Sequence, residues 1–434
     1  MIRLFLTLTL IVTGSALRAV EIDEITTPAG IDAWVVEERS IPFIAMELRM
    51  EGGGNLDRPG KRGAVNLMMA LLEEGSGDMD ARTFQEAREA LAASFSFDAY
   101  ADTTVVSTRF LTENADEAIA LLRQALLDPR FDEDAVERVR SQVLAGLAGD
   151  AQNPNRIAGD TFYEMAYPGH PYGSDMDGTP ETVAALTRED LFQAHRDTVT
   201  RAEIHVSVVG DVNGEEAAAL IDALVADLPA DAPDGPPNVP FGLEGGVTVV
   251  DFPTPQSVAL FGHSGIERDH PDFFAAYILN HILGGGSFES RLMTEVREKR
   301  GLTYGVSTFL VSRERTQSVL GQVASSNDRI AEAIDVIRAE WQRIADEGVT
   351  PEELDAAKTY ITGEYPLRFD GNGPIAEIMV GMQQVDLPTE YVFSRNSYID
   401  AVTLDDVNRV AAELLDADAL HFVVVGQPEG LNTN

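Results

Sequence analysis

The chain has 434 residues and carries 72 aspartates and glutamates against 32 lysines and arginines, a formal net charge of −40. This balance excludes proteins that bind nucleic acid through basic surfaces, and it fits a very soluble protein whose like charges are screened by salt. The length exceeds what one core supports, so two or more domains are expected. We interpret the acidic residues as a solvated surface; a docking surface for basic partners or peptides is the alternative.

Residues 1–19 are typical of an export signal. Arg3 precedes an apolar run over 4–12, and small residues follow it, so cleavage is expected after Ala16 or Ala19. The run is too short to span a membrane, and no later stretch is long enough. Without cysteine, the chain has no site for a disulfide or a lipid attached through sulfur. We expect a periplasmic protein that does not bind membranes.

The first half begins with a strand over 44–50 and then a helix over 63–75, GAVNLMMALLEEG. This helix follows a glycine-rich, charged approach, yet it contains no histidine and no acid before Glu73. An amphipathic helix over 81–93 comes next. The helix over 63–75 therefore lacks metal-binding and catalytic side chains at a place where the preceding residues would suit an active site.

The chain repeats itself at an offset of 216 residues. LTREDL begins at Leu186 and VTLDDV at Val402, while HVSVVGDV begins at His205 and HFVVVGQP at His421. Each pair predicts a capped helix, a short turn and a β-branched strand that ends in glycine. Two matches at one offset indicate two homologous halves.

A segment rich in proline and glycine, residues 228–246, separates the halves and predicts a linker. Strands over 246–252 and 257–263 open the second half, and a long amphipathic helix is expected over 327–348. We predict an α+β fold of two tandem homologous α/β-sandwich halves, each a mostly antiparallel sheet with helices packed on it. The predicted divisions are a signal peptide (1–19), an N-terminal domain (20–227), a linker (228–246) and a C-terminal domain (247–434).

The most specific run is NHILGGGSFESRLMTEVREKRGLTYGVST, residues 280–308. Its glycines break one helix, Ser287 is expected to cap the next, Gly301 to end that helix, and a strand to start at Thr303. The run resembles the pitrilysin/insulinase family of zinc metallopeptidases, the inverzincins, and most of all their bacterial and processing-peptidase-like branch. The segments 170–191 and 206–212 also match, so the resemblance covers essentially the whole mature chain.

In active members of that family a helix of the first half carries the zinc motif H-x-x-E-H, and a glutamate further along completes the site. Placed on this sequence, the resemblance puts Asn66 and Ala70 at the histidine positions, Met69 at the general base and Gly146 at the distal glutamate. These degenerate positions imply that the chain binds no metal and cannot hydrolyse peptides through zinc by itself.

The seven histidines do not suggest a metal site elsewhere. None lies four residues from another on a predicted helix, and the nearest pair, His263 and His270, is separated by a predicted loop. We interpret His170 as a structural residue of the HPYG turn.

The second half matches the family at Arg297 and Tyr304, which the resemblance implies are donors to the carbonyl of the scissile peptide, stabilising its developing charge. The alternative is structural: an arginine in the last helical turn favours the helix dipole, and a tyrosine on a strand is ordinary core. The loop Gly284, Gly285, Gly286 and Ser287 is expected to shape the substrate chamber. It is not a phosphate loop, because no G-K-[ST] follows.

The resemblance thus implies a non-catalytic subunit that completes a heterodimeric periplasmic zinc endopeptidase. The homologous partner would carry the zinc, this chain would carry no cofactor, and peptides would be the substrates. The alternative is a structural or peptide-binding pseudopeptidase without a hydrolytic role. A divergent hydrolase is a third reading, but the chain has no G-x-S-x-G motif and no cysteine nucleophile.

Overall fold

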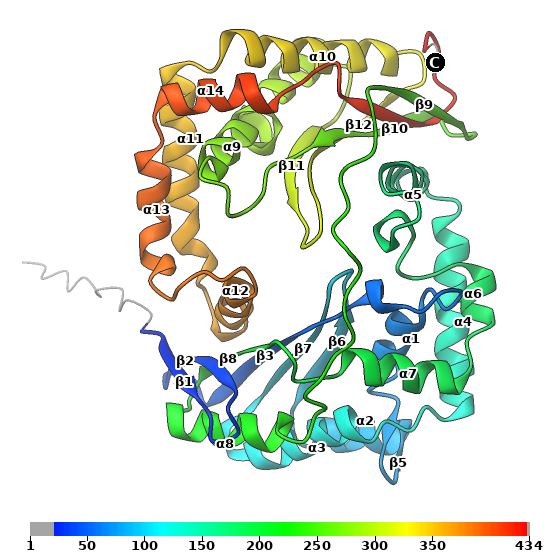
Figure 1. The fold of residues 1–434 in the computed structure, drawn as a ribbon, viewed down its shortest axis with the longest axis vertical. Coiled ribbons are helices and arrows are strands. Elements are labelled where there is room, and N and C mark those ends of the chain that lie inside the picture. Colours follow the sequence, from blue (N-terminus) through cyan, green and yellow to red (C-terminus); the bar gives the residue numbers. More distant parts are fainter. Residues whose placement is uncertain (1–20, 432–434) are drawn as a thin grey trace, which may run out of the picture.

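The computed structural model describes residues 21–431, so the predicted signal peptide lies outside the described residues. The chain forms two sheets with helices around them, and the two halves face one another (Figure 1). Within residues 21–431 no helix is both long and apolar enough to cross a membrane.

The first half is built on a six-stranded sheet in the order β1-β2-β8-β3-β7-β6. Its pairs are antiparallel except β2 with β8. The strands are β1 (Asp23–Thr26), β2 (Asp32–Glu37), β3 (Phe43–Glu51), β6 (Ser94–Ala99), β7 (Thr103–Leu111) and β8 (Ile204–Gly210), with a separate two-stranded ribbon of β4 (Gly75–Ser76) and β5 (Met79–Asp80). The helices are α1 (Ala64–Ala70), α2 (Ala81–Ala90), α3 (Ala115–Leu127), α4 (Glu133–Asp150), α5 (Pro154–Ala166), α6 (Pro180–Ala184), α7 (Arg188–Thr198) and α8 (Gly214–Val225).

The second half is built on a five-stranded sheet in the order β11-β12-β10-β13-β9, antiparallel except β13 with β9. Its strands are β9 (Gly246–Asp251), β10 (Gln256–Ser264), β11 (Val306–Ser312), β12 (Gln317–Ser326) and β13 (His421–Gly426). Its helices are α9 (Phe273–Asn280), α10 (Ile330–Glu347), α11 (Pro351–Glu364), α12 (Asn372–Gln384), α13 (Tyr391–Ala401) and α14 (Leu404–Leu414). The predicted fold class is confirmed.

The internal repeat is present in the structure at the predicted offset. Helices α7 and α14 start at Arg188 and Leu404, 216 residues apart. Each begins with a capping box, Thr187 with Asp190 and Thr403 with Asp406, which satisfies the free N–H groups of the first turn. Each then leads into a central strand of its sheet, β8 or β13.

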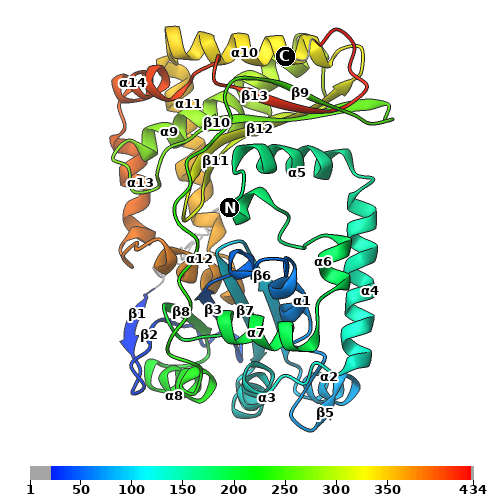
Figure 2. The ribbon, with the colours of Figure 1, turned by 45° about the vertical axis from the view of Figure 1, so that its right-hand side comes forward.

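The two halves exchange one helix each. Helix α5 of the first half packs on β10 and β13 of the second sheet, and α12 of the second half packs on β3 and β8 of the first (Figure 2). Buried side chains mark both contacts: Phe162 lies in one cluster with Val423, and Met379 lies in another with Val209. Each sheet is therefore covered on one face by a helix of the other half.

The segment between α8 and β9 contains no helix or strand and runs along the contact between the halves. Val239 N donates a hydrogen bond to Arg315 O (3.0 Å), in the turn between β11 and β12. Gly242 N donates to Ala166 O (2.9 Å), at the end of α5. The segment thus contacts both halves along its course.

Candidate functional site

The degenerate positions on α1 are split between core and surface. Met69 is only 1% exposed and belongs to the core of the first half, Asn66 is half-buried and Ala70 is exposed. Asp57 holds the start of the helix, because its carboxylate accepts the N–H groups of Gly63 (2.8 Å) and Val65 (2.9 Å). The helix is firmly anchored, yet the side chains at these positions offer no strong zinc ligand and no base.

Gly146, at the position of the distal glutamate, lies on an exposed face of α4, which contacts α1. A β-carbon there would meet nothing within 4 Å. The residues at these positions therefore do not fit zinc. Elsewhere within residues 21–431, no group of three or more histidine, aspartate or glutamate side chains could hold a metal ion.

The glycine loop packs tightly against β11. A β-carbon on Gly284 would lie 2.6 Å from Thr308 Oγ1, and one on Gly286 would lie 2.6 Å from His281 O. Residues His281–Gly285 form a π-helical turn, η4, and Ser287–Glu289 form a 3₁₀ turn, η5. Glycine is needed at 284 because the loop approaches β11 too closely for a side chain, and at 286 because the turn folds back on His281.

The next helical segment starts three residues later than the sequence predicts. Ser290 Oγ accepts the N–H of Met293 (3.4 Å), so Ser290 caps this segment at the position expected for Ser287. The segment continues as a π-helix, η6 (Met293–Glu298). Gly301 ends it with φ of +61°, as predicted.

Arg297 lies in the last turn of η6, and its guanidinium carbon is 4.7 Å from the ring centroid of Phe288. Tyr304 is 88% exposed and lies just before β11, which starts at Val306 rather than at Thr303. The structural alternative for Tyr304 is therefore wrong, since this ring is not part of a core.

Phe288, Tyr304, Gly284 and Gly285 line one open cavity of about 640 Å³. Asn155 from α5 also lines it, so both halves contribute to its wall. Gly286 faces a separate small cavity beside α11. Phe288 connects the two predicted functional residues, because it stacks on Arg297 and lines the same cavity as Tyr304. Its only signal in the sequence is an aromatic residue directly after the glycine loop.

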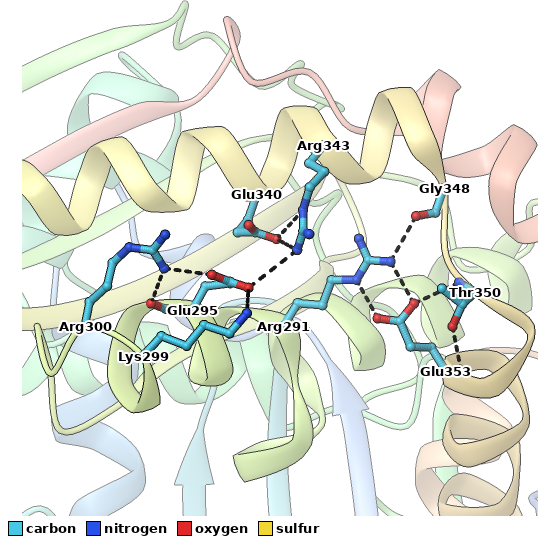
Figure 3. A network of polar contacts seen from close by, with 9 residues as sticks. All are labelled: Arg291, Glu295, Lys299, Arg300, Glu340, Arg343, Gly348, Thr350 and Glu353. Atoms are coloured by element: carbon cyan, nitrogen blue, oxygen red, sulfur yellow. Dashed lines mark hydrogen bonds and ion pairs between the residues drawn. The ribbon is translucent and has the colours of Figure 1, made fainter.

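A network of charged side chains holds η6 in place (Figure 3). Glu295 is buried and accepts from Lys299 (2.6 Å) and Arg300 (2.7 Å). These two hydrogen bonds keep the pKa of Glu295 below its usual range. Arg291, just before η6, makes a bidentate pair with Glu353 of α11 (2.6 and 2.7 Å). This network therefore fixes the segment that carries Arg297, and Arg297 itself takes no part in it.

The HPYG turn joins the two halves. Tyr172 donates to Asp102 and accepts the N–H of Arg315 (3.2 Å), which belongs to the turn between β11 and β12. His170 contacts Pro237 O (3.1 Å) and accepts from Tyr172 N (3.1 Å). These contacts fit the structural role predicted for His170.

Comparison with known sequences places two family profiles on the chain. Residues 35–179 match the insulinase profile (peptidase family M16), and residues 185–361 match the profile described as peptidase M16 inactive domain. Together they span most of both halves.

Individual relatives match over most of the chain. The chain is 24% identical to a Helicobacter pylori protein named non-peptidase homolog YmxG, over 95% of this chain and 94% of that protein. It is 27% identical to a Mycobacterium leprae protein named uncharacterized zinc protease, over 82% and 80%. The crystal structure of a peptidase M16 inactive domain from Pseudomonas fluorescens superposes with a TM-score of 0.88 at 26% identity, covering 95% of this chain and 99% of that one.

Proposed function

Since this chain belongs to the insulinase family of M16 peptidases, we propose that it is a non-catalytic subunit that completes a zinc endopeptidase in the periplasm. The observation that carries the proposal is an asymmetry between the halves. The positions of the zinc motif hold Asn66, Met69 and Ala70. Arg297 and Tyr304 remain: Tyr304 lines an open cavity, and Arg297 stacks on Phe288, which lines the same cavity.

The contribution of this chain is hydrogen-bond donation to a substrate carbonyl. The guanidinium of Arg297 makes no ion pair or hydrogen bond within the described residues, and the hydroxyl of Tyr304 is exposed. Both groups are free to donate to an oxygen that gains charge in the transition state, where such donors have their largest effect. The zinc ion and the attacking water belong to a homologous partner that carries the intact motif. We expect the peptide to pair as a strand with a sheet edge of that partner.

The competing proposal is a pseudopeptidase that binds peptides or only supports an assembly. Phe288 and Tyr304, which are 58% and 88% exposed, favour peptide binding, since aromatic side chains often anchor peptides. This role needs the cavity but does not need the donor groups of Arg297 and Tyr304.

Mixing experiments separate these roles. The chain would be purified alone and with a candidate zinc-bearing homologue, and cleavage of a quenched fluorescent peptide measured together with zinc content. If the chain completes the enzyme, activity appears only in the mixture and falls roughly a hundredfold or more in the Arg297→Ala/Tyr304→Phe variant. The matched control is Arg109→Ala/Tyr398→Phe, which removes the same groups from exposed positions outside the cavity.

Association without any change in cleavage would favour the structural role. Cleavage by this chain alone, with bound zinc, would contradict the interpretation of α1 and of Gly146.

A further inference from the structure

A second cavity of about 320 Å³ adjoins the first. Asn155, near the start of α5, lines both cavities. The second is lined by α5, by the HPYG turn and the residues after it, and by Arg313 at the end of β11. The two cavities therefore share one wall residue, at the start of α5.

Arg313 is a cation without an anionic partner. Its guanidinium carbon lies 4.6 Å from the ring centroid of Tyr163 and 4.8 Å from that of Tyr172. Of the lysines and arginines within residues 21–431, only Arg109, Arg297 and Arg313 make neither a hydrogen bond nor an ion pair through the side chain. In a chain with 72 acidic and 32 basic residues, an unpaired arginine in a cavity is a notable exception.

The other charges of this cavity are already paired. Arg62 donates to the carbonyl oxygens of Pro171 (3.0 Å) and Ser174 (3.0 Å), among others. Arg156 pairs with Asp160 (3.5 Å) and also contacts Asp175. The acidic groups of the wall thus lie beside Arg156, whereas the Arg313 side chain makes no ion pair within the described residues.

The aromatic contacts leave Arg313 ready to bind. A guanidinium that lies over aromatic rings keeps its N–H groups at the edge of its plane, where they can donate two parallel hydrogen bonds to one carboxylate. The rings also restrict the side chain, so less rotamer freedom is lost when a ligand binds.

We propose that Arg313 binds a carboxylate of the peptide held in the chamber, and that this cavity is a subsite for an acidic group. The inference rests on the proposed function in one respect, namely that the chamber receives peptides. The carboxylate comes either from the C-terminus of the peptide or from an aspartate or glutamate side chain, since both present the same two oxygens.

Binding can be measured on the chain alone, without zinc or partner. Fluorescence anisotropy at about 150 mM salt would compare four labelled peptides of one otherwise neutral sequence: free C-terminus, amidated C-terminus, amidated with one internal glutamate, and amidated with glutamine in its place. We expect carboxylate-bearing peptides to bind about tenfold or more tightly than their neutral counterparts, as for a charge-assisted hydrogen bond.

Arg313→Gln should remove this difference while keeping a planar group over Tyr163 and Tyr172. Arg109→Gln is the matched control, since Arg109 is likewise unpaired but is exposed on β7 and lines neither cavity. Circular dichroism and thermal unfolding of both variants would establish that they fold.

The subsite is supported if the chain prefers the free C-terminus, the glutamate or both. The preference also shows which carboxylate of the peptide binds Arg313. Equal affinity for all four peptides, no measurable binding, or an equal loss in Arg109→Gln would overturn it. The proposed function is tested by a different experiment. It fails if replacing Arg297 and Tyr304 leaves cleavage by the mixture unchanged.

Discussion

The Tyr172 hydroxyl donates a bifurcated hydrogen bond to Asp102, with the phenolic oxygen 2.8 and 2.7 Å from the two carboxylate oxygens. Tyr172 is only 3% exposed, and burial together with the adjacent charge of Asp102 raises its pKa far above the usual range. The pair lies where the first half meets the turn between β11 and β12, because Arg315 N donates to the same hydroxyl.

Tyr172→Phe is therefore expected to destabilise the chain by about 1.5–3 kcal/mol, the range for a buried hydrogen bond to a charged group. The variant leaves Asp102 with one fewer donor and Arg315 N without its acceptor. Urea unfolding at pH 7 would measure the change. Tyr163→Phe is the control, since the Tyr163 hydroxyl makes no hydrogen bond within the described residues; equal losses in both variants would contradict the assignment.

The partly buried carboxyl of Glu47 is expected to make the stability of the fold depend on pH. Burial raises the pKa of this β3 carboxyl to about 7, in spite of the hydrogen bond from Ser107 (2.7 Å). Because the folded-state pKa lies above the unfolded value of about 4.3, its contribution to stability is complete below that value and is lost as the pH rises to about 7.

Glu47→Gln, which stays neutral, should lack this loss and be more stable than the natural chain at pH 8, by about 1–3 kcal/mol, with little gain at pH 4.5. Unfolding curves at both pH values test this. Glu89→Gln, at an exposed position of α2, should change stability equally at both. A pH-independent effect of Glu47→Gln would refute the assigned pKa.

Glu295 is expected to change the stability of the fold with pH in the opposite direction. Hydrogen bonds from Lys299 and Arg300 lower its pKa, so its contribution is present above the unfolded value and is lost as the pH falls through the folded-state pKa. Glu295→Gln should cost about 1–3 kcal/mol at pH 7, and the loss should shrink below about pH 4. Glu298→Gln on the same segment, exposed and without a side-chain partner within the described residues, is the control.

Restoring the zinc motif is expected to cost much more stability at Met69 than at Ala70. Met69→Glu would place a carboxylate in the core and should destabilise the chain by about 3 kcal/mol or more. Ala70→His, at an exposed position, should change stability by less than about 0.5 kcal/mol. Met69→Leu controls for the shape change and should cost under about 1.5 kcal/mol. A small effect of Met69→Glu would mean that this position still opens to solvent.

Local signals in the sequence predicted the repeat and most elements correctly. Thr187 and Thr403 stand three residues before acids, so the two capping boxes could be identified without a structure. The error at Thr303 is also local, because Gly305 N donates to Thr303 Oγ1 (3.0 Å) and this turn delays the strand to Val306.

What the sequence could not predict depends on distant contacts. An amphipathic pattern tells which face of α5 or α12 is buried, but not that the helix packs on the sheet of the other half. Arg313 looks like any exposed arginine until its neighbours are known. Its lack of an acidic partner is a property of the assembled chamber, so only the structure makes it a candidate.

The exchange of α5 and α12 also bears on ancestry. These helices occupy corresponding places in the repeat, and each covers the sheet of the opposite half. Two separate copies of a single half could make the same exchange as a domain-swapped, twofold dimer. Gene fusion through a connecting segment would then have turned that dimer into one chain. Association of the two halves would no longer depend on protein concentration, because the linker sets a fixed effective concentration. Once joined, the two copies were free to diverge, and one could lose its metal ligands while the other kept its donors.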